Sequence, residues 1–172
     1  MDIIVKSALN TLLKSQYILT SLTNAQLSDT SVAPYYSSIG SHIRHILDFY
    51  DCILNVDSNK CIDLTARGRN REVENCCNKA LEYLNSVIKR LKEIDCNLND
   101  TVIITDDLGL GKVDIPYTLA SALSQANSHT IHHYAIISYI LNGLRIFLED
   151  SDLGYNPTTP KSQPSIPNKL IY

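Results

Sequence analysis

Several features typical of other protein classes are missing from this 172-residue sequence. No apolar run approaches the ~18 residues that a membrane-spanning helix needs. The five cysteines are odd in number and form no Cys-x-x-Cys pair, so neither a disulfide framework nor a zinc knuckle is expected. Lysine and arginine are dispersed and the net charge is −3, which argues against a nucleic-acid-binding face. The acidic, helix-like residues 1–6 do not resemble a secretory signal. We therefore expect a cytoplasmic protein that contacts neither membrane nor nucleic acid.

Helical periodicity dominates what is present. Hydrophobic residues make up 44% of the chain and charged residues 19%, which is typical of one globular domain of this length. Apolar residues recur at three- and four-residue spacing in four segments, approximately 3–22, 38–55, 71–94 and 119–147. Ser37 or Ser38 can cap the second of them. The sequence predicts four amphipathic helices.

The remaining segments predict turns, one hairpin and an irregular tail. Residues 101–105 and 112–118 are β-prone and flank a Gly-rich turn. Four prolines fall in the last sixteen residues. The predicted fold class is all-α: an antiparallel four-helix bundle with a short β-hairpin between the third and fourth helices. We expect a metal-binding bundle over 1–150 and an irregular tail over 151–172 that packs on the bundle or is partly disordered.

All five histidines fall in two short windows, 41–45 and 129–133, inside two different predicted helices. His129 and His133 are four residues apart, so their side chains share one helix face, and this face is the core-facing one. That spacing lets two imidazoles bind one ion. His132 falls on a more polar flank of the helix. We expect it at the rim of the site or in contact with one of the metal-binding side chains.

The partner histidine in the 38–55 helix stays open between His42 and His45. A helical wheel places His42 roughly 60° nearer the apolar centre. Asp48, however, lies one turn after His45 and could orient its imidazole. Burying an unpaired imidazole is costly, so the alternative to metal binding is a set of core histidines that hydrogen-bond to other side chains.

Three histidines without an obligate fourth ligand are typical of a catalytic metal site with an open position. The reacting group would be a water or thiolate bound to the metal, with His42 as a candidate base. All-imidazole ligation suits a divalent transition metal such as Zn, Ni or Fe, and also Cu. No histidine has Glu three residues before it, which argues against a ferritin-like di-metal centre. No residue is assigned to an organic cofactor.

The two histidine windows resemble the DinB-like putative metalloenzymes, a superfamily of four-helix bundles. The resemblance covers nearly the whole chain and is most specific in residues 38–48 and 128–135, with further similarity in 63–69 and 154–159. It implies three metal ligands, His45, His129 and His133. In that family one ligand is the first residue of a His-apolar-x-Asp motif, which here begins at His45. The resemblance thereby favours His45 over His42.

The resemblance also implies a broad function: a thiol-dependent S-transferase or a hydrolase acting on a small molecule, with a low-molecular-weight thiol as cosubstrate. The alternative is a non-catalytic, stress-associated metal-binding bundle. Family members often form homodimers, and the resemblance implies the same for this chain. Arg67, Arg69 and Arg71 form a short basic cluster that either anchors an anionic cosubstrate or pairs with nearby glutamates and solvent.

Overall fold

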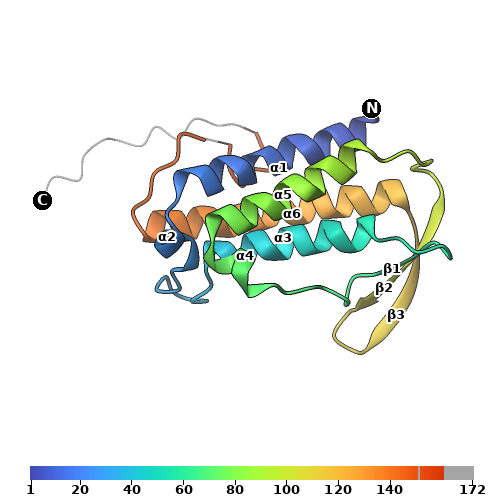
Figure 1. Ribbon diagram of the computed structural model, residues 1–172, viewed down its shortest axis with the longest axis horizontal. Coiled ribbons are helices and arrows are strands. Elements are labelled where there is room, and N and C mark those ends of the chain that lie inside the picture. The colour runs from blue at the N-terminus through green and yellow to red at the C-terminus, as the bar shows by residue number, and fades with distance from the viewer. Residues whose placement is uncertain (151, 161–172) are drawn as a thin grey trace, which may run out of the picture.

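Four long helices form the body of the computed structural model, which describes residues 1–150 and 152–160. They are α1 (Ile3–Ser21), α3 (Ile39–Leu54), α5 (Cys77–Lys92) and α6 (Leu119–Gly143) (Figure 1). Two short helices, α2 (Asn24–Ser28) and α4 (Arg71–Asn75), lie at one end of the bundle. Three strands, β1 (Cys61–Asp63), β2 (Thr101–Asp107) and β3 (Lys112–Thr118), lie at the other end. The predicted helical bundle is present, but the fold is not purely all-α, because the described residues also form a small three-stranded sheet.

Helices α3 and α6 face each other and run in opposite directions. Two ring contacts between them show this, since His42 meets His133 while His45, one turn further along α3, meets His129, one turn earlier on α6. Each helix contributes an apolar face to one continuous core, in which Ile43, Ile46 and Ile137 are almost fully buried. The two histidine windows therefore lie opposite one another.

Helices α3 and α5, in contrast, run in the same direction. Asp48 contacts Tyr83, and further along both helices Asp51 contacts Arg90. The same holds for α1 and α6 (Figure 1). The antiparallel bundle that we predicted is therefore present only in part, since α3 and α6 are antiparallel whereas α3 and α5 are parallel. The long connection over residues 55–70 returns the chain past the sheet before α4 begins, so that α3 and α5 become parallel neighbours.

The sheet contains one strand more than the predicted hairpin. β1 lies in a segment that we expected to be a loop, and it pairs in parallel with β2, with Cys61 opposite Ile103. β2 and β3 form the predicted antiparallel hairpin. Three residues are too few to show the period-two pattern of a strand. The segment forms a strand because Ile62 is buried and because β1 pairs with β2. The result is a small mixed sheet in the order β1-β2-β3.

The third predicted helix, 71–94, is broken at Cys76. Its backbone is extended there, with φ −136° and ψ 115°. The N–H of Cys77 donates to Oδ1 of Asn24 at 2.9 Å, so a side chain from α2 caps the start of α5. α4 also lies against Gly40, where an added Cβ would come within 2.0 Å of the Glu74 carbonyl oxygen. These long-range contacts explain why one periodic segment forms two helices.

The helix starts follow the expected capping chemistry, and the ends depend on the surrounding chain. Ser38 caps α3 by accepting a hydrogen bond from the Ser41 N–H, as predicted. α6 ends at Gly143, four residues before the expected end, and Arg145 has a positive φ of 57°. Within the predicted tail, Leu153 is buried and its carbonyl accepts a hydrogen bond from Ser138. Residues 151 and 161–172 lie outside the described residues, and the division at residue 150 stays a prediction.

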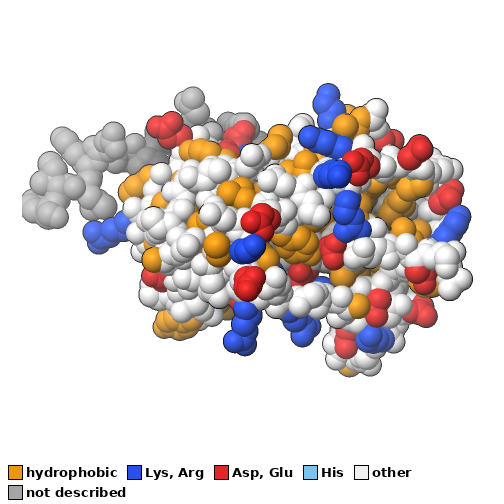
Figure 2. Space-filling model, in the orientation of Figure 1, with side chains coloured by type: hydrophobic (Ala, Val, Ile, Leu, Met, Phe, Trp, Pro, Cys, Tyr) orange, Lys and Arg blue, Asp and Glu red, His pale blue; other side chains and the backbone are white. Residues whose placement is uncertain are grey.

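The charges on the visible surface are mixed in sign. Figure 2 shows lysine and arginine interspersed with aspartate and glutamate on one face of the molecule. None of the helices in the described part of the chain combines the length and apolar character that crossing a bilayer requires.

Candidate metal centre

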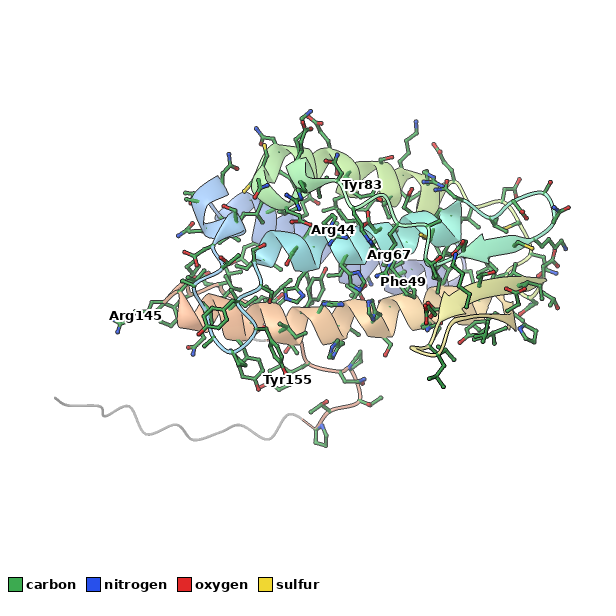
Figure 3. All side chains as sticks on the ribbon, turned by 90° about the horizontal axis from the view of Figure 1, so that it is seen from below. Arg44, Phe49, Arg67, Tyr83, Arg145 and Tyr155 are labelled. Carbon is green, nitrogen blue, oxygen red and sulfur yellow. The ribbon has the colours of Figure 1, made fainter. Side chains whose placement is uncertain are left out.

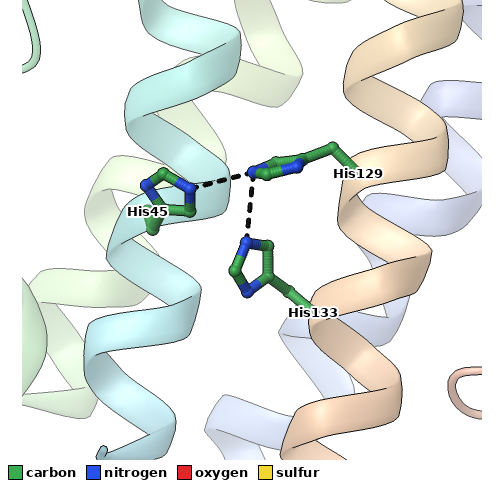
Figure 4. Close-up of side chains that lie close together, drawn as sticks. All are labelled: His45, His129 and His133. Carbon is green, nitrogen blue, oxygen red and sulfur yellow. Dashed lines mark hydrogen bonds between the residues drawn. The ribbon is translucent and has the colours of Figure 1, made fainter. Parts of the chain in front are cut away.

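Three histidine side chains from α3 and α6 converge on one point (Figure 4). Nε2 of His129 lies 2.9 Å from Nε2 of His45 and 3.1 Å from Nε2 of His133. All of the candidate ligand atoms lie within 4.8 Å of one another. His133 is buried, whereas His45 and His129 are half-buried, so the cluster is still reached by solvent. The structure thus brings together the three histidines that the resemblance implied.

The spacing of these nitrogens fits a single transition-metal ion. Zn–N bonds of about 2.0–2.1 Å at tetrahedral angles separate neighbouring ligand nitrogens by about 3.4 Å. Hydrogen bonding alone fits the arrangement poorly, because a neutral imidazole has one donor and one acceptor nitrogen. Nε2 of His129 faces two ring nitrogens at once and cannot make a well-directed hydrogen bond to both. Three lone pairs directed at one ion would resolve this conflict.

The protonation of the cluster is also what a metal site needs. Burial, followed by the neighbouring histidines, lowers the pKa of His133 to about 3. Burial, followed by His129 and two arginines, lowers the pKa of His45 to about 4. Burial lowers the pKa of His129 as well, followed by the effects of His132 and Arg67. All three rings are therefore neutral at pH 7, and a histidine binds a metal only in its neutral form.

His42 touches the cluster from the outside. Its Nδ1 lies 2.9 Å from Nδ1 of His133, and its Nε2 lies 2.8 Å from the Ser37 hydroxyl. With Nε2 of His133 directed at a metal, its Nδ1 carries the proton and donates it to Nδ1 of His42, and Nε2 of His42 donates to Ser37. One nitrogen of His42 thus holds His133, and the other is held by Ser37. This favours a positioning role over the base that we considered from the sequence.

Asp48 acts on a different partner from the one predicted. We expected its carboxylate to orient a ligand imidazole, but among the described residues it accepts hydrogen bonds from Arg44, from the Tyr83 hydroxyl and from the backbone N–H of Arg69. Asp48 is only 2% exposed, so these three donors compensate its buried charge. Figure 3 shows Arg44 and Tyr83 among the side chains of α3 and α5. Asp48 therefore fixes the loop that follows β1 against α3.

His132 lies near the cluster without joining it, and Cys52 is a separate buried thiol on α3. The ring of His132 is exposed, with its centroid 5.4 Å from that of His133, which agrees with a place at the rim. Cys52 is buried, and its pKa is raised to about 11, chiefly by burial and then by nearby aspartates. Its thiol is therefore protonated at neutral pH and is a poor ligand or nucleophile.

Two further residues border the site, and sequence periodicity did not place them there. Phe49 stacks on His129, with ring centroids 4.9 Å apart. Arg67 reaches His45 from the loop after β1, with Nη1 2.9 Å from Nδ1. Arg67 and Phe49 are labelled in Figure 3. The short basic cluster was the only signal for Arg67, and it did not indicate which arginine reaches the histidines.

Comparisons with protein-family models, with curated proteins and with solved structures find no significant match for this chain. The structural findings are a mostly helical fold and a partly buried cluster of three histidines that could bind a metal. Both agree with the DinB-like resemblance.

Proposed function

We propose that this chain is a metal-dependent enzyme of the DinB-like class, in which His45, His129 and His133 hold one divalent transition-metal ion. One observation carries the proposal: three neutral imidazoles from two facing helices direct Nε2 to the same point. Three protein ligands leave room for a further ligand, as in catalytic rather than structural sites. The half-exposed His45 and His129 leave that side of the cluster accessible to a small molecule.

The proposed reaction is a thiol-dependent S-transfer or a hydrolysis. Bound at this site, the ion would supply Lewis-acid activation of a thiol or a water molecule. The protein's own contribution is positional: His42 holds the ring of His133, and Phe49 packs against His129. A supported and pre-oriented ligand set is what such chemistry requires. Zn, Ni and Fe all suit three imidazoles.

The proposal is tested on untagged protein that has been stripped and reloaded with Zn²⁺, Ni²⁺ or Fe²⁺. Cysteine, glutathione and bacillithiol are screened by thermal shift, and turnover is measured with a thiol plus an alkylating electrophile, or with an activated ester alone. We expect turnover that depends on metal and is lost in His129→Ala. The matched control is His132→Ala, which removes an exposed histidine of the same helix and should leave metal binding intact.

Two results would separate the alternatives. If metal raises the thermal stability but neither assay gives turnover, the ion acts only as a structural clasp and the enzyme proposal is wrong. If neither metal binding nor turnover is found, the histidines are hydrogen-bonded core residues, and the whole proposal is wrong.

A further inference from the structure

We infer that Arg67 is the receptor for a carboxylate group on the molecule that this site acts on, and that it becomes available when the histidines hold a metal. The inference rests on the proposed metal site and names the chemical class of its ligand. The half-buried guanidinium of Arg67 lies beside His45 and has no anionic partner among the residues that the structure describes.

The hydrogen-bonding capacity of Arg67 is largely unused. Among the described residues its side chain makes a single hydrogen bond, from Nη1 to Nδ1 of His45. Nε is buried and has no hydrogen-bond partner in the described part of the chain. Nearby Arg44, by comparison, is bound by two carboxylates, those of Asp48 and Glu74. A buried N–H without an acceptor costs free energy, and a guanidinium fork matches the two oxygens of a carboxylate.

The loop around Arg67 is fixed at both ends. Leu64 is buried and its N–H donates to the Thr105 carbonyl of β2. On the other side, the N–H of Arg69 donates to buried Asp48. The guanidinium is therefore presented by an anchored loop next to the histidines. A receptor needs this pre-organisation, because it reduces the entropy lost on binding.

Local charge also favours an anion. Three neutral imidazoles would leave the charge of a bound divalent ion uncompensated, and Arg67 would add a further positive charge beside the ion. Asp48 and Glu74 are already engaged by Arg44, and the charge of Asp106 in β2 is the smallest of the causes that shift the pKa of His129. A ligand that carries a carboxylate would compensate both the ion and Arg67.

The contact with His45 makes the two binding events interdependent. Arginine is only a donor, so Nδ1 of His45 must accept the hydrogen bond from Arg67, and the proton of the neutral ring then lies on Nε2. A metal at Nε2 requires the opposite tautomer, with the proton on Nδ1. Metal binding and the Arg67–His45 hydrogen bond therefore exclude each other. Metal binding thus frees the guanidinium of Arg67. A carboxylate that binds this guanidinium then favours the metal-bound form.

The test measures Co²⁺ affinity of the full chain from the visible absorption of the bound ion, at fixed pH and ionic strength, with either acetate or uncharged acetamide present. Acetate should tighten Co²⁺ binding by about tenfold relative to acetamide, which is the effect of one charge-assisted pair. In Arg67→Met the acetate effect should fall below about twofold. With acetamide present, Co²⁺ should bind to Arg67→Met more tightly than to the wild type. Arg69→Met removes the same charge from an exposed side chain two residues away and should behave like the wild type.

The outcomes separate this inference from the proposed function. Equal acetate effects in the wild type and Arg67→Met, or no acetate effect in the wild type, would overturn the role of Arg67 while leaving the metal site intact. Failure of the wild type to bind Co²⁺, Zn²⁺ or Ni²⁺ at all would overturn both.

Discussion

The imidazole of His133 has two tasks at once, since Nε2 faces His129 and Nδ1 faces His42. Only one tautomer lets Nε2 point a lone pair at a metal, and that tautomer needs an acceptor at Nδ1. His42 supplies the acceptor and is itself held by Ser37. The relay reaches from the buried ring to the start of α3 and assigns His42 a role different from that of the three converging histidines.

This role predicts the behaviour of His42 variants. In His42→Ala the Nδ1 proton of His133 loses its acceptor, and Zn²⁺ affinity should fall by about 10- to 100-fold, the usual cost of losing a residue that supports a ligand. His42→Gln retains an amide oxygen that can accept the proton, so it should recover part of the affinity. Competition titration with a chromophoric chelator measures both. Loss of all Zn²⁺ binding in His42→Ala would mean that His42 is itself a ligand.

Single residues show how far the sequence could predict the site. His129 and His133 followed from their four-residue spacing alone. The choice between His42 and His45 could not be made from periodicity, because a helical wheel finds the centre of the packed core and the histidines converge to one side of it. Arg67 could not be placed at all, since its contact with His45 depends on β1 and on the anchoring of a loop by Asp48.

At the scale of elements, α3 is held by close backbone contact with α4. An added Cβ on Gly40 would lie 2.0 Å from the Glu74 carbonyl oxygen, a distance that the rigid backbone of α4 cannot relieve cheaply. The same helix carries His42 and His45, so this contact also sets the position of half of the site.

Gly40→Ala should therefore lower the free energy of unfolding by about 2–4 kcal/mol, since overpacking against backbone forces α3 and α4 apart. Gly68→Ala is the matched control, because no atom lies within 4 Å of its added Cβ, and it should change stability by less than about 0.5 kcal/mol. Urea denaturation followed by circular dichroism gives both values. Equal stability of the two variants would contradict the close packing.

The elements that periodicity predicted were the long ones. α1, α3 and α6 begin within about two residues of their predicted starts. The short elements depend on contacts with distant residues: β1 on pairing with β2, and the break at Cys76 on Gly40 and Asn24. A local pattern contains no information on such partners, and the relative direction of α3 and α5 was missed for the same reason.

At the scale of the whole molecule, the histidine cluster couples stability to pH. His45 and His133 have pKa values of about 4 and about 3 in the folded protein, chiefly because of burial, against an ordinary value near 6.5. Between these values the unfolded chain binds more protons than the folded one, so acid favours unfolding. Stability is thus fully present above about pH 6.5 and falls as the pH is lowered towards the folded-state values.

We expect the free energy of unfolding, measured with a chelator present, to fall by about 2 kcal/mol between pH 7.5 and pH 5, after allowance for the solvent exposure of His45. The double variant His45→Gln/His133→Gln should lose most of this dependence. His132→Gln, which changes an exposed ring, should retain it. An unchanged pH dependence in the double variant would show that other groups are responsible.

The proposed centre depends most directly on whether the three histidines hold one ion. The decisive measurement is the metal content of untagged protein by mass spectrometry, after incubation with Zn²⁺ and removal of loosely bound ion. We expect about one ion per chain in the wild type and in His132→Ala, and less than about 0.1 ion per chain in His129→Ala/His133→Ala. A wild-type chain without stoichiometric metal, or a double variant that retains it, would contradict the proposed centre.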